Sequence, residues 1–216
     1  ALQAAASAPK AIPAFDYLDA TAQDSYANVG DYDTIMSKSR SGREFARVSE
    51  LDASREGETV WVRGRLASIR VKGKSCFLVI RQDTFDTLQG CFFKTSDDEE
   101  GGTQMLTYLK TLTVESVVDV MGTLTPASVK SCSVTDAELV LERIHTVSRA
   151  QATLPFLVED AARPEAEIDA SQDTERPFPR LGQELRLDNR WMDLRTPAQN
   201  SILRIQSGIC QLFREF

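Results

Sequence analysis

Apolar and polar side chains alternate with a period of two along residues 59–94, in three consecutive segments. These segments are Thr59–Arg70, Cys76–Arg81 and Thr87–Lys94. A period of two is typical of strands that bury one face of a sheet. Gly73 lies between the first two segments, where glycine accepts the positive φ of a tight turn. The other face carries aromatic, amide and guanidinium groups, which stack on and hydrogen-bond with unpaired bases.

The residues after the third segment continue the pattern with one helix and two more strands. Apolar residues spaced three and four apart predict a short amphipathic helix over Thr103–Leu112. Alternation returns over Glu115–Leu124 and Asp136–Val147, which predicts a fourth and a fifth strand. This order matches the mainly β, five-stranded OB-fold barrel, in which a helix commonly lies between strands 3 and 4. An open α+β sheet remains an alternative for the same pattern.

The two ends of the chain differ from this central domain. We expect residues 1–43 to form an N-terminal extension that is flexible or partly helical, with one short helix within 24–38. The barrel domain then spans 44–150. Proline-rich and acidic residues predict a hinge or linker over 151–184, and residues 185–216 begin a further domain.

A long helix is predicted at the end of the chain. It begins with Thr196 as N-cap and Pro197 in the first turn. Its apolar stripe consists of Ile202, Ile205, Ile209, Leu212 and Phe213. Because such a stripe needs a partner surface, we expect the chain to be the N-terminal part of a longer protein, interrupted inside its second domain.

The charge of the chain is unevenly distributed. A net charge of −7 over 216 residues by itself argues against a nucleic-acid partner. Residues 38–94, however, carry 12 basic and 7 acidic side chains, a net of +5. The basic residues of the predicted strands that can face phosphates are Arg63, Arg65, Arg70, Lys72, Lys74 and Arg81. A solvated sheet face is the alternative explanation.

Cysteine and histidine are sparse. The four cysteines lie far apart, and His145 is the only histidine. A disulfide framework and a zinc site are therefore not expected, and a reducing compartment is favoured. No apolar run is long enough to span a bilayer, so we expect no membrane partner.

Several motifs resemble a known family. VWVRGRL, GKSCFLVIRQ, LQGCFFK, ESVVDVMGTL and AELVLERIHTVS together resemble the N-terminal anticodon-binding domain of class II aminoacyl-tRNA synthetases of the aspartyl, asparaginyl and lysyl subgroup. LPFLVEDAARPEAE, RLDNRWMDLRT and SILRIQSGICQLFRE resemble, more specifically, the eukaryotic-type cytosolic aspartyl-tRNA synthetases. The resemblance covers residues 44–216, and LDNRWMDLRT is its most discriminating part.

The resemblance implies a cytoplasmic, homodimeric ligase. Such an enzyme activates aspartate with ATP and Mg²⁺ and transfers it to tRNA(Asp). The last helix resembles the opening of the first class II motif, which begins an α/β catalytic domain and builds the dimer interface. The ATP-binding motifs are expected beyond Phe216, so we expect no catalytic residue and no bound cofactor in this chain. The alternative is a non-catalytic OB-fold module that binds single-stranded nucleic acid.

The resemblance also implies a set of anticodon-reading residues. Phe77 would stack on an unpaired base, against the alternative of a core phenylalanine. Gln89 carries a donor and an acceptor and suits uracil, whereas Glu138 only accepts and suits the N1–H and N2 amino edge of guanine. Arg70 contacts a phosphate or a cytosine acceptor, and Ser131 is a weaker candidate. Together they would read the family's anticodon GUC, and each of the four polar candidates has an ordinary surface residue as its alternative.

The remaining candidates have simpler roles. Lys72 and Lys74 flank Gly73, and we expect them to contact backbone phosphate, which affects affinity rather than specificity. Two solvated lysines are the alternative. A structural role is expected for His145, and packing roles are expected for Trp61 and Trp191. Of Phe92 and Phe93, which alternate faces, one is expected in the core.

Overall fold

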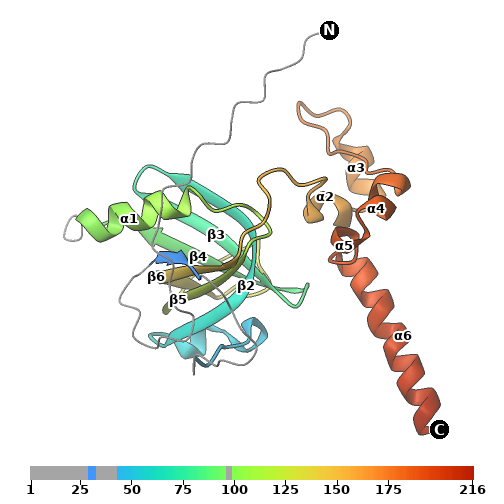
Figure 1. The fold of residues 1–216 in the computed structure, drawn as a ribbon, viewed down its shortest axis with the longest axis horizontal. Coiled ribbons are helices and arrows are strands. Elements are labelled where there is room, and N and C mark those ends of the chain that lie inside the picture. Colours follow the sequence, from blue (N-terminus) through green and yellow to red (C-terminus); the bar gives the residue numbers. More distant parts are fainter. Residues whose placement is uncertain (1–28, 33–42, 96–98) are drawn as a thin grey trace. The chain divides into compact units, whose positions relative to one another are not determined.

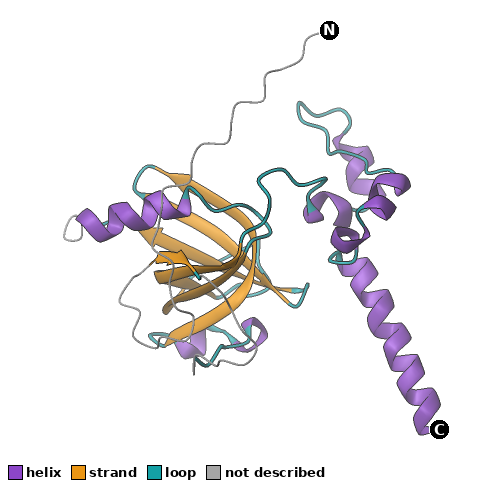
Figure 2. Cartoon of the chain, in the orientation of Figure 1, coloured by secondary structure: helices purple, strands orange, loops and turns teal. Residues whose placement is uncertain are grey.

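The computed structural model describes residues 29–32, 43–95 and 99–216. The chain divides into two compact units, which we describe separately. The first comprises the described residues up to Gln82 together with Thr87–Ala150, and the second comprises Asp83–Asp86 and Gln151–Phe216. Strands dominate the first unit and helices the second (Figure 2).

The first unit is built on a closed β-barrel (Figure 1). Its strands are β2 (Thr59–Lys72), β3 (Ser75–Gln82), β4 (Asp86–Phe93), β5 (Val117–Pro126) and β6 (Ala137–Ser148). The strands pair in the order β6-β4-β3-β2-β5, and a further β5–β6 pairing closes the ring. Closure confirms the predicted OB-type barrel and excludes the open α+β sheet. Two short 3-10 helices, η1 (Val48–Glu50) and η2 (Ala53–Arg55), precede β2.

Strand β2 is long enough to serve two neighbours. Its first half pairs with β5, from Thr59 opposite Thr123 to Arg65 opposite Val117. Its second half pairs with β3, and a register shift follows Leu66. Such an irregularity bends a strand, which is how a short barrel turns its corners.

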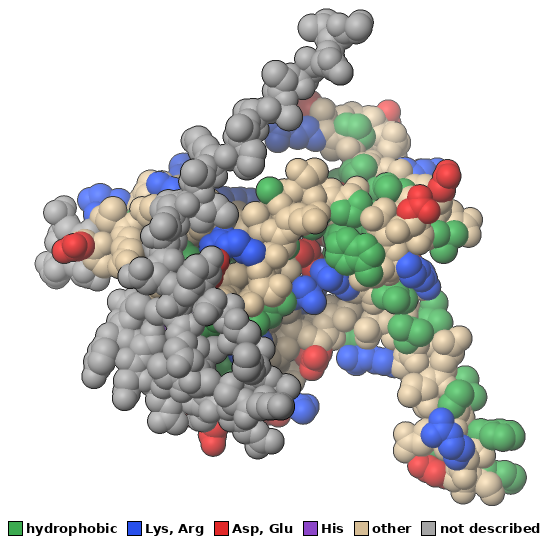
Figure 3. Space-filling model, in the orientation of Figure 1, with side chains coloured by type: hydrophobic (Ala, Val, Ile, Leu, Met, Phe, Trp, Pro, Cys, Tyr) green, Lys and Arg blue, Asp and Glu red, His purple; other side chains and the backbone are tan. Residues whose placement is uncertain are grey.

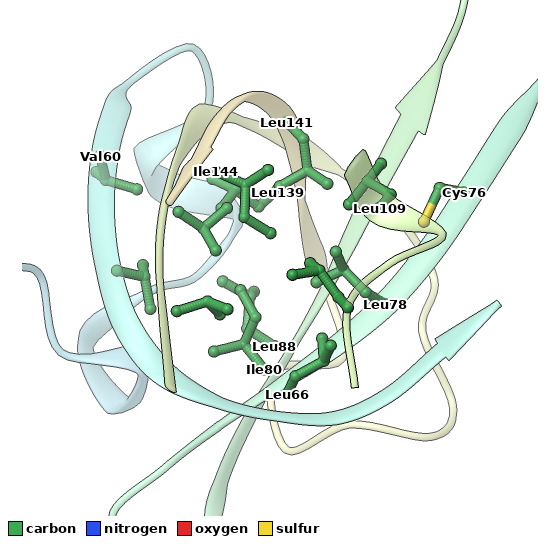
Figure 4. Close-up of a cluster of buried hydrophobic side chains, with 14 of the residues drawn as sticks. Val60, Leu66, Cys76, Leu78, Ile80, Leu88, Leu109, Leu139, Leu141 and Ile144 are labelled. Carbon is green, nitrogen blue, oxygen red and sulfur yellow. The ribbon is translucent and has the colours of Figure 1, made fainter. Parts of the chain in front are cut away.

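The barrel interior holds the main hydrophobic core (Figure 4). The alternating residues predicted to face inward are buried, including Leu66, Cys76, Leu78, Ile80 and Leu139. Helix α1 (Glu99–Leu109) lies between β4 and β5 in the chain, and it starts and ends earlier than predicted. Its apolar residues Met105, Leu106, Tyr108 and Leu109 join the same core. Burial of the inner face therefore fixes which side chains remain on the outer face.

A short strand, β1 (Val29–Asp31), lies outside the barrel and pairs in parallel with β6. The short helix predicted within 24–38 is therefore wrong for residues 29–31, which form a strand. Residues 24–28 and 33–38 of that prediction lie outside the described residues. Val29 is buried, and the Tyr108 hydroxyl lies 2.8 Å from the carbonyl oxygen of Gly30. Burial opposes ionisation of Asp31, but hydrogen bonds from Arg149 and Tyr108 outweigh it and lower the pKa of its carboxyl. These long-range contacts hold β1, although its sequence alone gave no strand pattern.

The second unit consists of short helices followed by one long helix. The helices are α2 (Val158–Ala162), α3 (Glu165–Ser171), α4 (Gln183–Asp188), α5 (Arg190–Asp193) and α6 (Pro197–Glu215). Helices α2 and α3 lie in the segment predicted as a hinge. A small core of Phe156, Val158, Ala161 and Met192 packs α2 against α5. The buried carboxylate of Asp193 accepts hydrogen bonds from Arg186 and Arg190.

Helix α6 begins at Pro197, as predicted, with Thr196 at the N-cap position. The Thr196 hydroxyl does not cap the helix; it donates to the carbonyl oxygen of Asp193 at 2.8 Å. The apolar stripe of α6 is exposed, from Ile202 at 49% to Phe213 at 84% (Figure 3). Within the described ranges, none of the helices combines the length and apolar character needed to cross a bilayer.

Candidate nucleic-acid interface

The outer face of β2, β3 and β4 carries most of the predicted base-reading residues. Phe77 lies between the buried residues Cys76 and Leu78 on β3, and its side chain is 41% exposed. Arg70 lies directly opposite Phe77 on β2 and is also exposed. Phe77 is therefore an outward-facing residue, and the alternative of a core phenylalanine is excluded. An exposed ring beside a guanidinium group is able to stack on an unpaired base.

A second exposed ring borders Phe77. Phe93, at the end of β4, is 52% exposed, and its ring centroid lies 5.6 Å from that of Phe77. The two rings are nearly perpendicular, with an interplanar angle of 83°. This is the edge-to-face geometry that aromatic pairs favour. Phe92 packs partly against the core. Because neighbouring residues of a strand face opposite sides, the sequence alternation already indicated that Phe93 faces outward, but Phe93 was not among the predicted site residues.

Gln89 and Glu138 meet on two strands that are far apart in the sequence. Strand β4 pairs in parallel with β6, with Gly90 opposite Leu139. Gln89 Nε2 donates a hydrogen bond to Glu138 Oε2 at 2.8 Å. Both side chains are partly exposed. They form a linked amide–carboxylate pair, which the sequence did not predict.

Cys91 is fully buried beside this pair. Burial, together with the negative charge of Glu138, raises the pKa of the Cys91 thiol to about 12. The thiol therefore stays protonated at neutral pH and is not a nucleophile. Cys76 and Cys132 are also buried, whereas Cys210 is exposed, and all four cysteines are free.

Three exposed basic residues lie near the turn between β2 and β3. They are Arg70, Lys72 and Lys74, and Gly73 between the lysines has a φ of +59°. The Lys94 backbone N–H donates to the carbonyl oxygen of Lys74 at 2.8 Å, which joins this turn to the end of β4, next to Phe93. Within the described part of the chain, these three side chains make no ion pair or side-chain hydrogen bond. Their charges remain available to phosphate groups.

The other three basic residues of the predicted strands are engaged inside the unit. Arg63 binds the buried carboxylate of Asp119 through two hydrogen bonds, of 2.6 and 2.8 Å. Arg81 pairs with Glu115 at 2.6 Å, and Arg65 donates to the Glu115 carbonyl oxygen at 3.2 Å. The interpretation of Arg63, Arg65 and Arg81 as phosphate contacts is therefore wrong, because carboxylates already bind Arg63 and Arg81 and a backbone carbonyl oxygen binds Arg65.

Ser131 lies apart from the pairs described above. It is exposed in the connection between β5 and β6, and its hydroxyl lies 4.0 Å from the sulfur of Cys132. The neighbouring Ser133 instead contacts β4, where its hydroxyl accepts from the Thr87 backbone N–H at 2.7 Å. The structure thus gives Ser131 no contact with Phe77, Gln89 or Glu138 among the described residues.

His145 and Trp61 belong to one aromatic cluster, together with Tyr32. The His145 ring stacks on Trp61, with 5.8 Å between centroids, and His145 Nδ1 lies 3.2 Å from the Tyr32 hydroxyl. The Arg43 guanidinium lies 4.5 Å from the centroid of the Trp61 ring. Burial and the charge of Asp119 raise the pKa of Tyr32 to about 12. His145 is fully buried, so this cluster packs the barrel's surface rather than offering a ligand site. Among the described residues, no group of three or more His, Cys, Asp or Glu is placed to hold a metal ion.

Comparison with known proteins agrees with this geometry. Residues 60–147 match the tRNA anti-codon family, described as an OB-fold nucleic acid binding domain. The cytoplasmic aspartate–tRNA ligase of Caenorhabditis elegans is 39% identical over 189 residues, 86% of this chain and 35% of that protein. The human cytoplasmic enzyme is 36% identical over 202 residues, 93% of this chain and 38% of that protein.

A solved structure extends the similarity to the fold. The aspartyl-tRNA synthetase from Entamoeba histolytica gives a TM-score of 0.79 at 27% identity, covering 94% of this chain and 44% of that chain. The chain spans little more than a third of the length of the curated relatives named above. It belongs to the aspartyl-tRNA synthetase family, and its residues 60–147 form a tRNA anticodon-binding OB-fold domain.

Proposed function

We propose that this chain binds the anticodon loop of tRNA(Asp) through the outer face of its barrel. The observation that carries the proposal is the exposed Phe77 ring on a face that also presents the Gln89–Glu138 pair. A splayed base needs a ring to stack on and polar groups that reach its edge. The ring lies on β3, and the polar pair lies on β4 and β6, which follow β3 in the strand order of the barrel.

Each residue has a separate task in this proposal. Phe77 stacks on one anticodon base, and Gln89 pairs with the donor and acceptor of uracil. Glu138 accepts from the guanine edge, since a carboxylate that accepts one hydrogen bond keeps further lone pairs. Arg70 contacts a phosphate or a cytosine acceptor. Ser131 remains a weaker candidate.

Lys72 and Lys74 complete the proposed surface as phosphate contacts. They flank a glycine turn and are exposed. Lysine binds phosphate as a point charge without reading the base, so these two residues supply affinity rather than specificity.

We further propose that the whole protein is a cytoplasmic aspartate–tRNA ligase that uses ATP and Mg²⁺. The relatives carry this name, and the chain resembles them along most of its length. The exposed stripe of α6 fits a homodimer interface. We assign residues 1–43 to the N-terminal extension, 44–150 to the anticodon-binding domain, 151–184 to the hinge and 185–216 to the start of the catalytic domain.

The proposal is tested by measuring binding of this chain to synthetic anticodon stem-loops that differ by one base. Phe77→Ala removes the stacking platform, so we expect a loss of about 1–3 kcal/mol in binding free energy with every loop. Gln89→Ala is expected to weaken binding chiefly for loops with uridine at the middle position. Phe85→Ala, which removes an exposed phenylalanine in the turn between β3 and β4, is the matched control.

Two outcomes would contradict the proposal. Unchanged affinity of Phe77→Ala would show that the loop binds elsewhere. Equal loss by Gln89→Ala against all four middle bases would remove Gln89 as a reading residue. A non-catalytic single-strand-binding module would bind all loops alike, without preference for the aspartate anticodon.

A further inference from the structure

The contact between Gln89 and Glu138 has a defined polarity. The amide nitrogen of Gln89, Nε2, faces Glu138 Oε2 at 2.8 Å. An ionised carboxylate only accepts hydrogen bonds, so it binds the NH₂ end of the amide and rejects the oxygen end. Glu138 is anchored in turn, because its neighbour Leu139 lies opposite Gly90 in the β4–β6 pairing. The orientation of the amide is therefore set by a charge on another strand.

Amide orientation decides which pyrimidine fits. Uracil offers a donor at N3–H next to the acceptor O4, whereas cytosine offers an acceptor at N3 next to the donor N4–H₂. A carboxamide held in one orientation matches only one of these patterns at a given base position. Rotated by half a turn, the same group matches the other pattern, because its oxygen and nitrogen ends change places.

We infer that Glu138 is a positioning residue that locks the amide of Gln89 and so makes the site select uridine against cytidine. The inference rests on the proposed role of Gln89 as the reader of a pyrimidine. It adds a function for Glu138 that does not require contact between its carboxylate and the RNA. The lock acts before RNA binds, since the hydrogen bond is present in the free chain.

The test is Glu138→Gln, which replaces the acceptor-only group with one that both donates and accepts. The amide of Gln89 then bonds equally well in either orientation. We expect the ratio of affinities for stem-loops with U and C at the middle position to fall about tenfold, the size of one bidentate base contact. Both loops lose the guanine contact proposed for Glu138 to the same extent, so the ratio isolates the lock, and binding to the U loop weakens more than binding to the C loop.

Glu142→Gln is the matched control. Glu142 lies on the same strand, is exposed, and accepts from the Thr123 hydroxyl at 2.7 Å rather than from Gln89. Its variant should leave the U/C ratio unchanged. A second measurement needs no RNA: the side-chain amide protons of Gln89, observed by ¹H–¹⁵N NMR, should shift and exchange faster in Glu138→Gln but not in Glu142→Gln.

The outcomes separate the lock from the proposed function. A lower U/C ratio together with altered Gln89 amide signals supports the lock. Equal weakening of both loops by Glu138→Gln, or unchanged amide signals, overturns it. If Gln89→Ala leaves the U/C ratio unchanged while the amide signals still respond to Glu138→Gln, the contact exists but Gln89 does not read the base, and the proposed function fails instead.

Discussion

Arg63 and Arg70 lie on the same strand and carry the same charge, but their surroundings differ. Arg63 holds the carboxylate of Asp119, whose side chain is 1% exposed, whereas Arg70 is exposed beside Phe77. A buried carboxylate that loses its partner is costly, while an exposed arginine contributes little to stability. The first arginine therefore belongs to the fold, and the second to the proposed binding surface.

This difference gives a prediction at the residue scale. Arg63→Ala leaves Asp119 buried without its guanidinium, so we expect the free energy of unfolding to fall by about 2 kcal/mol. Arg70→Ala should change stability by less than about 0.5 kcal/mol. Denaturant titration measures the free energy of unfolding of both variants. Under conditions where both variants are folded, stem-loop binding should weaken only for Arg70→Ala. Equal stability of the two variants would refute the division.

The sequence predicted the orientation of some single side chains but not their contacts across strands. The outward orientation of Phe77 followed from its position between Cys76 and Leu78. The contact of Gln89 with Glu138 did not follow, because it depends on the pairing of β4 with β6. Period-two alternation assigns a residue to a face, but it does not say which residue of another strand lies beside it.

At the scale of elements, close approach of strands depends on two glycines. A Cβ atom at Gly122 on β5 would lie 2.1 Å from the carbonyl oxygen of Val140 on β6. A Cβ atom at Gly64 on β2 would lie 2.4 Å from a side-chain carbon of Ile80 on β3. Both clashes fall inside the barrel wall. The first involves a backbone atom, which moves only if the strands separate.

Gly122→Ala should therefore destabilise the barrel by about 1–3 kcal/mol, the usual cost of forcing atoms into a packed site. Gly208→Ala is the control, since apart from its chain neighbours and its own helix backbone no atom lies within 4 Å of its Cβ position, and alanine favours a helix interior by about 1 kcal/mol. Unfolding is followed by Trp61 fluorescence in a Trp191→Phe background, because Trp61 lies in the barrel. If Gly122→Ala left the midpoint of the unfolding transition unchanged, β5 and β6 would be able to move apart without loss of stability.

Strand β1 is an element that the alternation of apolar and polar residues did not predict. Three residues are too few to show a period of two, and the segment was expected to be flexible or helical. The strand exists because Tyr108 and Arg149 bind its backbone and Asp31 from 77 and 118 residues away in sequence. Tertiary contacts therefore outweigh weak local propensity here.

At the scale of the whole molecule, an acidic chain presents a local basic surface. The net charge is −7, but three of the exposed basic groups near the β2–β3 turn, Arg70, Lys72 and Lys74, have no acidic partner in the described residues. Salt weakens such contacts because phosphate neutralisation releases counterions. The acidic remainder of the chain disfavours non-specific binding to nucleic acid.

The salt dependence of loop binding tests this arrangement. The double variant Lys72→Ala/Lys74→Ala should reduce the slope of log K against log salt by about 1.4, at about 0.7 for each phosphate contact with a single strand. Preference among middle bases should stay the same. Lys110→Ala, which removes an exposed lysine after α1, should leave the slope unchanged. A slope unaffected by the double variant would place the phosphates elsewhere.

The sequence by itself determined the strands of the barrel, their inner and outer faces, and the start of the last helix. These features are local, because the side-chain period and the Thr-Pro helix start depend only on neighbouring residues. The tertiary structure alone decided that Arg63 and Arg81 pair with carboxylates and Arg65 with a backbone carbonyl oxygen, that β1 joins the sheet, and that Gln89 meets Glu138. Those outcomes depend on groups far apart in the chain, whose charges and hydrogen bonds act only once folding has brought them within a few ångströms of each other.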